Sequence, residues 1–520
     1  MNYVAEDMAD APLELDGFGV TPTDVVAVAR SGRSVRLGQA ALSRMEDSAG
    51  IVAELAAGAV PAYGVSTGFG SLANTVIPAE RRAELQRAIV RSHAAGMGPP
   101  IEVEVVRAMV FLRARTLAMG YSGARPHVVE TMLGLLDACI TPVVPEFGSL
   151  GASGDLAPLS ACALVLLGEG AATDSDGGLI DGAEAMRRLG TGPLELTAKE
   201  GLALINGTDG MLGMLILALA DLDELAKIAD IAAAVTVEAL LGTDRPFAAD
   251  LQALRPQVGQ AVSAANLMAL LADSAIVASH REGDDRVQDA YSLRCSPQVH
   301  GSVRDIMAFA AGVASIELES AIDNPMIMPD GRVESCGNFH GAPLAHAADY
   351  LAVAVADLGA LSERRTDRML DRNRSHGLPP FLTDDAGVNS GLMIAHYTQA
   401  AMTAENRRLA APASVDTIPT SALQEDHVSL GWSACRKLRK AIDNLRAILA
   451  VELVCGARAL DFRAPLVPAP GTAAAREALR SVVPGPGPDR WLAPELEAAV
   501  GALREGRLTA AVAEAGIGLR

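Results

Sequence analysis

Aromatic residues are scarce in this chain of 520 residues, at 3% of the total, although half of all residues are apolar. A core of this composition must consist of Ala, Leu, Val, Ile and Met, packed mostly between helices. Basic residues are also in the minority, with 43 Lys and Arg against 63 Asp and Glu and a formal net charge of −20. Without clustered Lys and Arg, neither nucleic acid nor an anionic membrane surface is expected as a partner.

Cysteine is rare as well, with six scattered residues and no CxxC pair. This pattern is typical of reduced thiols in the cytosol rather than of a disulfide framework. The acidic residues 1–17 do not have the charge pattern of a signal peptide. The uncharged stretches 55–79 and 386–404 contain Gly, Pro or polar residues that do not suit a membrane span. We therefore expect a cytoplasmic protein.

Helical periodicity dominates the chain, and strictly alternating runs are few and short. The predicted helices cover 80–95, 104–119, 126–138, 199–241, 305–321, 344–364 and 437–459. This pattern predicts an all-α protein built around a bundle of long helices. We expect an N-terminal helical, loop-rich portion over 1–210, a central long-helix bundle over 211–464, and a Pro/Gly linker with a C-terminal helical tail over 465–520.

The most unusual segment is GSLGASGDLAPLS, at 148–160. One interpretation is a flexible loop followed by a helix that Asp155 caps and that carries Pro158 in its first turn. The other starts from Ala152, Ser153 and Gly154. The amide nitrogen of Gly154 is sterically free to attack the carbonyl carbon of Ala152, and loss of water from the ring and from Ser153 then gives 4-methylideneimidazol-5-one (MIO), an electrophile. The tripeptide alone does not decide between them.

Further segments occur along the rest of the chain in a recognisable order. They are YGVSTGFG at 63–70, RSHAAGMG at 91–98, ALINGTDG at 203–210, QDAYSLRCSPQVHG at 288–301, DNPMI at 323–327, GNFHG at 337–341 and QEDHVS at 424–429. Together with 148–160, they make the chain resemble the histidine and aromatic amino acid ammonia-lyases and aminomutases over essentially its whole length. The resemblance implies an ammonia-lyase/fumarase-aspartase-like all-α fold and a homotetramer whose active sites draw residues from more than one subunit.

The resemblance also assigns roles to individual residues. The implied catalytic residues are Tyr63 as base for the substrate β-proton, Ala152, Ser153 and Gly154 as the source of MIO, and Asn206 and Tyr291 beside the prosthetic ring. The implied substrate-binding residues are His93, Gln288, Arg294, Phe339 and Glu425, with Arg294 holding the carboxylate. Outside the family context each has an ordinary structural interpretation, such as a helix-end histidine, a surface ion pair or a core aromatic.

The pair His93 and Glu425 favours histidine as substrate, because a buried carboxylate accepts a hydrogen bond from imidazole but has no partner beside a phenyl ring. The expected reaction converts L-histidine to trans-urocanate and ammonia, without pyridoxal phosphate (PLP) or NAD. The nine histidines show no HExxH-type spacing, so no metal site is expected. Two residues depart from the family pattern: Leu423, where many histidine enzymes have Asn, and His300, where an apolar residue is commoner.

Three alternatives remain open. The nearest is a lyase or 2,3-aminomutase that acts on tyrosine or phenylalanine through the same prosthetic group. A fumarase/aspartase-like lyase also eliminates across Cα–Cβ, but its GSSxMPxKxN signature does not occur here. A non-catalytic helical assembly protein would leave Ala152, Ser153 and Gly154 uncyclised.

Overall fold

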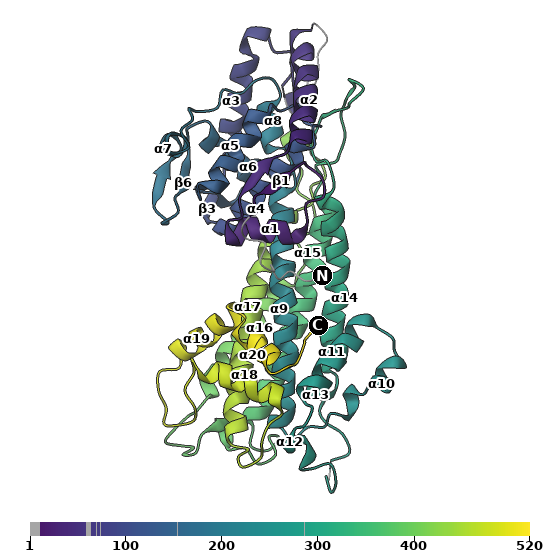
Figure 1. Ribbon diagram of the computed structural model, residues 1–520, viewed down its shortest axis with the longest axis vertical. Coiled ribbons are helices and arrows are strands. Elements are labelled where there is room, and N and C mark those ends of the chain that lie inside the picture. Colours follow the sequence, from purple (N-terminus) through teal and green to yellow (C-terminus); the bar gives the residue numbers. More distant parts are fainter. Residues whose placement is uncertain (1–10, 59–63, 69, 73, 153, 285) are drawn as a thin grey trace. The chain divides into compact units, whose positions relative to one another are not determined.

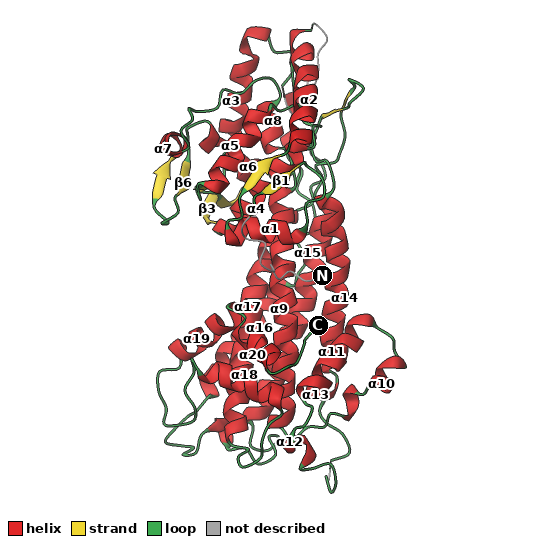
Figure 2. Cartoon of the chain, viewed as in Figure 1, coloured by secondary structure: helices red, strands yellow, loops and turns green. Residues whose placement is uncertain are grey.

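The computed structural model describes residues 11–58, 64–68, 70–72, 74–152, 154–284 and 286–520. Helices account for 59% of the chain, against about a third in an average globular protein. Figure 2 shows that the strands are few and short beside the helices. The all-α prediction is confirmed.

Two compact units make up the chain, and each is assembled from three separate stretches. The first unit comprises Met1–Ala220, Ala311–Ala348 and Ala413–Arg436, and the second comprises Asp221–Ala310, Asp349–Pro412 and Lys437–Arg520. Each unit combines stretches that are distant in sequence, whereas the predicted portions 1–210, 211–464 and 465–520 are continuous. The two divisions therefore cannot be compared directly. Those three portions stay a prediction.

The first unit contains short and medium helices. They are α1 (Pro22–Val26) with a π-helical turn (Ala27–Ser31), α2 (Gln39–Ala57), α3 (Arg82–His93), α4 (Val103–Ala118), α5 (Pro126–Asp137), α6 (Leu156–Leu166), α7 (Gly182–Arg188) and α8 (Glu200–Ile205). Helix α4 packs on α5, and α3 packs on both α6 and α8 (Figure 1). A capping box starts α1: the Asp24 amide donates to Thr21 Oγ1, and the Thr21 amide donates to the Asp24 carboxylate.

All described strands belong to the first unit. They are β1 (Leu13–Leu15), β2 (Val35–Leu37), β3 (Met97–Pro100), β4 (Thr141–Pro142), β5 (Pro145–Phe147), β6 (Ala171–Thr173), β7 (Leu179–Asp181), β8 (Met326–Ile327) and β9 (Val333–Glu334). Strand β1 pairs with β2 in parallel, with Leu13 opposite Val35. The antiparallel pairs are β3–β5, β4–β6, β6–β7 and β8–β9. These small sheets join the segments that connect the helices.

Four long helices contribute residues to both units. They are α9 (Asp209–Ala239), α14 (Ser296–Leu318), α15 (Ala342–Leu370) and α17 (Gly431–Asp461). Two stretches, Glu200–Ala239 and Ala342–Leu370, are long and apolar enough to cross a membrane by length and composition, but the apolar window of the first is wholly buried in the protein. A helix that is apolar on all sides is also what the core of a large helical protein requires.

The second unit also contains shorter helices. They are α10 (Ala249–Ala253), α11 (Val258–Leu270), α12 (Ala275–Ala278), α13 (Tyr291–Arg294), α16 (Met393–Leu409), α18 (Pro470–Arg480), α19 (Ala493–Arg504) and α20 (Arg507–Glu514). In Figure 1, α18 and α20 lie against each other, and their contacts agree. Between α15 and α16 the described residues contain one short 3-10 turn, Pro380–Leu382, and α18 lies within the Pro/Gly-rich stretch 465–488 that the sequence predicts as a link.

Most predicted helices are present with shifted ends. The run 199–241 is divided: α8 ends at Ile205 and α9 begins at Asp209, with Asn206 in a non-helical conformation between them. The predicted cap of α6 is only partly right. Asp155 occupies the N-cap position but its side chain makes no capping bond, because both carboxylate oxygens are engaged elsewhere.

His300, one of the two departures from the family pattern, lies in a buried polar network of the second unit. Its Nδ1 is 2.7 Å from Asp230 Oδ1, and its Nε2 is 3.2 Å from a guanidinium nitrogen of Arg365. Burial lowers the pKa of His300, although the Asp230 carboxylate opposes this. The neutral ring thus bridges an anion and a cation.

Candidate active site

The loop that leads into α6 is held from both sides. The amide of Asp155 donates to the carbonyl of Gly207 over 2.7 Å, and the carbonyl of Gly151 accepts from the Ser429 hydroxyl over 3.2 Å and from the Gly341 amide over 3.3 Å. Three segments far apart in sequence therefore hold the tripeptide that starts at Ala152. Its central residue, Ser153, lies outside the described residues.

Glycine is the only residue type that fits at position 154. Its φ is +76°, and a Cβ built there would lie 2.1 Å from the carbonyl oxygen of Gly207. Any side chain would therefore collide with a fixed backbone atom. Ala152 beside it is 8% exposed. At Gly154 the backbone is packed against the backbone of Gly207, with no space for a side chain.

Asp155 is a buried carboxyl group directly after this segment. Its Oδ1 accepts from the Ser149 hydroxyl over 2.9 Å and its Oδ2 from the Met211 amide over 2.9 Å. Burial raises the pKa of Asp155 to about 7 despite these hydrogen bonds, and the nearby Asp209 acts in the same direction. The group joins the start of α6 to the start of α9.

A cavity of about 510 Å³ lies in the first unit next to this loop. Leu156 and Asn206 line it on the loop side, and Ser92, His93 and Glu425 contribute polar groups. The remaining lining residues are Gly68, Gly70, Leu72, Thr75, Ile77, Leu85, Ala88, Ile89, Leu202, Asn324 and Ser421. A mostly apolar cavity with a few polar groups is the usual form of a small-molecule site.

His93 is the last residue of α3. Its Nδ1 is 3.0 Å from the hydroxyl of Ser92, which is itself 3.1 Å from the carbonyl oxygen of Ile89. Burial lowers the pKa of His93, and the charge of Glu425 opposes that shift only in part. The imidazole is therefore neutral at pH 7, with one nitrogen able to donate and the other able to accept.

Asn206 occupies the break between α8 and α9. Its Nδ2 donates to Asp323 Oδ1 over 3.2 Å and to the carbonyl of Asn324 over 2.9 Å, while the buried Lys199 ammonium donates to Asp323 Oδ2 over 2.6 Å. Its Oδ1 is buried and has no hydrogen-bond partner among the described residues. Since both amide hydrogens are engaged, the group that Asn206 offers to a ligand in this rotamer is an acceptor.

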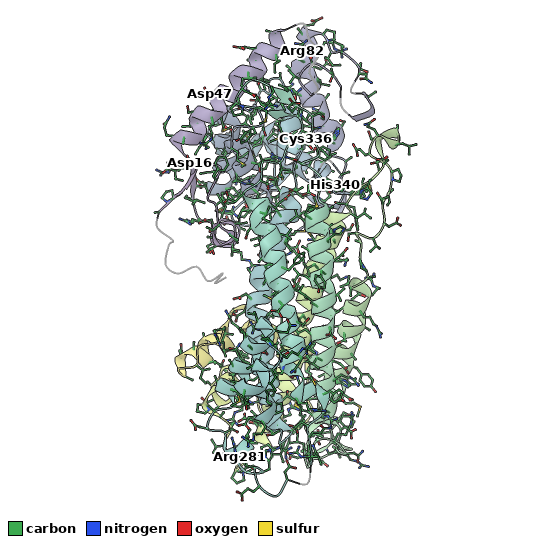
Figure 3. The ribbon with its side chains drawn as sticks, turned by 90° about the vertical axis from the view of Figure 1, so that its right-hand side faces the viewer. Asp16, Asp47, Arg82, Arg281, Cys336 and His340 are labelled. Atoms are coloured by element: carbon green, nitrogen blue, oxygen red, sulfur yellow. The ribbon has the colours of Figure 1, made fainter. Side chains whose placement is uncertain are left out.

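The Gly-rich segment after residue 63 forms one wall of the cavity. The Gly68 amide donates to the carbonyl of Thr75 over 2.9 Å, and the Ile77 amide donates to the carbonyl of Ser66 over 2.9 Å. Arg82, labelled in Figure 3, donates to the carbonyls of Ile77 and Ala56. Tyr63, the predicted base, lies outside the described residues.

Phe339 lies in a turn, with the His340 amide donating to the carbonyl of Gly337 over 3.0 Å. It is half-buried and is not among the residues that line the cavity. Figure 3 labels Cys336 and His340 in the same part of the first unit, and His340 Nε2 lies 3.3 Å from the carbonyl oxygen of His427. Next to this turn, the Gly341 amide donates to the carbonyl of Gly151.

Gln288, Tyr291 and Arg294 belong to the second unit, where Gln288 and Arg294 line a cavity of about 450 Å³. The Arg294 guanidinium stacks 4.7 Å from the ring centre of Tyr291, and its Nε is buried with no partner among the described residues. Three-residue spacing would place Gln288 on one helical face with Tyr291 and Arg294, but α13 begins only at Tyr291, after extended backbone at Ala290, so Gln288 is not on that face.

The chain matches the aromatic amino acid lyase family over residues 20–481. It is 60% identical over 494 residues to the histidine ammonia-lyase of Streptomyces coelicolor, covering 95% of this chain and 96% of the relative, and 49% identical over 501 residues to that of Gloeobacter violaceus, covering 96% and 97%. The chain belongs to the aromatic amino acid lyase family. The resemblance predicted from the sequence is thereby confirmed.

Solved structures agree with this assignment to the aromatic amino acid lyases. The tyrosine aminomutase of Streptomyces globisporus superposes with a TM-score of 0.92 at 38% identity, covering 98% of this chain and all of that one. Histidine ammonia-lyase from Trypanosoma cruzi gives a TM-score of 0.89 at 37% identity, covering 97% and 96%.

The residues around Ala152 and Gly154 fit the prosthetic group expected for an aromatic amino acid lyase. The glycine that must lack a side chain is the one packed against Gly207, and both neighbours of the tripeptide are tied to other segments. Asn206 lines the cavity on the side of this loop. For a metal ion, by contrast, no group of three or more His, Cys, Asp or Glu side chains with suitable geometry occurs in the described ranges.

Sequence reasoning missed several residues of the site. Asp323 accepts from both Asn206 and Lys199, while Thr420, whose hydroxyl donates to Glu425 Oε2 over 3.1 Å, lies beside the cavity. Lys199 and Asp323 both carried a weak signal, since Asp323 is the first residue of the family segment 323–327 and Lys199 lies shortly before the segment 203–210. Their pairing depends on contacts between residues more than one hundred positions apart, which no local pattern encodes.

Proposed function

We propose that this chain converts L-histidine to trans-urocanate and ammonia. The observation that carries the proposal is the presence of neutral His93 and the Glu425 carboxylate in one cavity beside the Ala152–Gly154 loop. Together they offer an imidazole ring both an acceptor and a group that donates or accepts. The high identity to enzymes named histidine ammonia-lyase supports the same substrate.

We further propose that Ala152, Ser153 and Gly154 cyclise to MIO. When formed, this group supplies an electrophile that makes the substrate amine a better leaving group. Glu425 accepts the imidazole N–H of the substrate, and His93 bonds the other ring nitrogen. Arg294 holds the substrate carboxylate through two parallel N–H donors.

Tyr63 takes the proton from the substrate β-carbon in this proposal. The electron pair of the broken C–H bond forms the Cα–Cβ double bond, and the amine leaves as ammonia. A deprotonated phenol suits this role as general base. Asn206 and Tyr291 lie beside the prosthetic ring, and Gln288 and Phe339 complete the contacts with the substrate or ring.

The decisive experiment combines intact mass with an ultraviolet assay for urocanate. We expect the purified protein to weigh two water molecules less than its sequence requires, and to produce urocanate from L-histidine. Ser153→Ala should restore the full mass and lower turnover on the order of a thousandfold or more. Full mass in folded, wild-type protein would refute the MIO proposal.

A tyrosine or phenylalanine lyase or aminomutase is the second candidate, because the tyrosine aminomutase structure superposes so well. Its signature would be the same mass deficit with no turnover of histidine and with turnover of tyrosine or phenylalanine. A β-amino acid product would identify an aminomutase, and an unsaturated acid would identify a lyase.

We also propose a homotetramer in the cytoplasm whose active sites combine residues from more than one chain. The lining residues of the 510 Å³ cavity all come from the first unit, whereas Arg294 and Gln288 belong to the second. Co-expressed Glu425→Ala and Arg294→Ala chains should recover activity that neither variant has alone. No recovery in mixed tetramers would contradict shared sites.

A further inference from the structure

The segment Thr420–Glu425 forms a closed turn at the edge of the cavity. The Thr420 amide donates to the carbonyl of Glu425 over 2.9 Å, and the Glu425 amide donates to the carbonyl of Thr420 over 3.3 Å. The Thr420 hydroxyl adds a third bond, to Glu425 Oε2 over 3.1 Å. Backbone and side chain of Glu425 are thus held by the same residue.

Three consecutive residues inside this turn have left-handed backbone conformations. Their φ values are +51° for Ser421, +53° for Ala422 and +68° for Leu423. None of them is glycine, so each conformation is unfavourable and persists only where surrounding bonds impose it. Such strain concentrates at functional sites. In this turn, it presents Ser421 and Glu425 to the cavity.

The Thr420 hydroxyl makes the two oxygens of the Glu425 carboxylate inequivalent. Oε2 accepts from Thr420, whereas no described residue donates to Oε1. A carboxylate with one oxygen engaged has one defined orientation, which leaves the other oxygen for a donor in the cavity.

We propose that Thr420 is a positioning residue that sets the orientation of Glu425 toward the substrate ring. It thereby contributes to the preference for a ring that carries an N–H donor. This inference rests on the proposed deamination of histidine. Thr420 acts through Glu425 and does not contact the reacting atoms.

Thr420→Val tests the proposal, because valine keeps the branched shape and the backbone bonds but lacks the hydroxyl. We expect KM for L-histidine to rise about tenfold with a smaller change in kcat, since a hydrogen bond to a charged group is lost. Thr420→Ser should restore KM to within about twofold of the wild type. Turnover of phenylalanine, which lacks the N–H donor, should change less than that of histidine.

Thr417→Val is the matched control. The Thr417 hydroxyl accepts from the Val428 amide over 2.8 Å and lies 3.4 Å from the Val428 carbonyl oxygen, so it holds the same loop without touching Glu425. This variant should lower the thermal midpoint and leave KM for histidine unchanged. If Thr420→Val does not fold, Thr420→Ala in the same assays takes its place.

An unchanged KM in Thr420→Val, or an equal rise in Thr417→Val, would overturn the assignment of Thr420. A failure of the serine variant to restore KM would do the same. Wild-type protein that does not act on histidine would instead refute the proposed function, and this inference with it. The wild-type assay therefore separates the two failures.

Discussion

The buried carboxylates of the second unit and the Glu425 carboxylate of the first differ in how many donors surround them. Glu452 accepts from Thr236, from Ser362 and from both Nε and Nη2 of Arg365, and Asp230 is equally surrounded. Glu425 accepts one side-chain hydrogen bond, from Thr420. A saturated carboxylate has no capacity for a ligand, whereas one with a free oxygen in a cavity does.

The same contrast separates two histidines. His300 has both ring nitrogens engaged, by Asp230 and Arg365, in the interior of the second unit. His93 has its Nδ1 beside Ser92 and lines the cavity of the first unit. Both have lowered pKa values because of burial, so the pKa alone does not distinguish a structural from a substrate-binding histidine.

The largest effect on stability is expected at Glu452. Glu452→Ala leaves the Arg365 guanidinium buried without a counter-charge, which should cost about 3–5 kcal/mol of unfolding free energy. Denaturant unfolding measures this loss. KM for histidine in the folded fraction should stay at the wild-type value. A rise in KM without loss of stability would contradict a purely structural role for Glu452.

Asp155 should make stability depend on pH. Its folded pKa, raised to about 7, lies above the ordinary carboxyl value, so the folded state holds a proton that the unfolded state releases. Stability should therefore fall as pH rises from about 4.5 to 7, by on the order of 3 kcal/mol from this group.

Asp155→Asn removes this titration while keeping an acceptor for the Met211 amide. As pH rises across this range, the thermal midpoint of the wild type should therefore fall relative to that of the variant. Parallel pH profiles of the two proteins would contradict the raised pKa. Asp230 differs, because hydrogen bonding to His300 and the charge of Arg304 lower its pKa, so its stabilising contribution is lost only as pH falls below the ordinary carboxyl pKa.

Glu425→Gln tests the other member of this comparison, the carboxylate that lines the cavity. We expect kcat/KM for histidine to fall about a hundredfold, because a charged acceptor for the imidazole N–H is lost. Since Glu425 is only half-buried, the unfolding free energy should change by less than about 1 kcal/mol. Steady-state kinetics and denaturant unfolding on the same preparation test both statements. Unchanged kinetics would remove Glu425 from the site.

The smallest effect is expected at Leu423, which is 71% exposed and has a φ of +68°. Asparagine tolerates this conformation better than leucine does, so Leu423→Asn should stabilise the protein by about 0.5–1 kcal/mol. The thermal midpoint should rise slightly with kcat/KM for histidine within about twofold of the wild type. A lower midpoint would show that the turn is not strained at this position.

The sequence by itself determined the all-α class, the long helices and the family. Helical periodicity and turn residues are local properties, and the ordered segments at 148–160, 203–210 and 424–429 identify the family without coordinates. It also indicated His93 and Glu425 as ring-binding residues. It did not predict that α13 begins only at Tyr291, because the backbone before a short helix depends on its surroundings.

Only the tertiary structure decided which polar groups are saturated and which remain available. Lys199, Asp323 and Asn206 are joined by hydrogen bonds across more than one hundred residues, and Thr420 reaches Glu425 only because the turn between them is left-handed. Hydrogen bonds depend on positions and angles at a scale of tenths of an ångström, which packing of the whole unit sets. Residue types name the possible donors and acceptors, and the fold selects which of them meet.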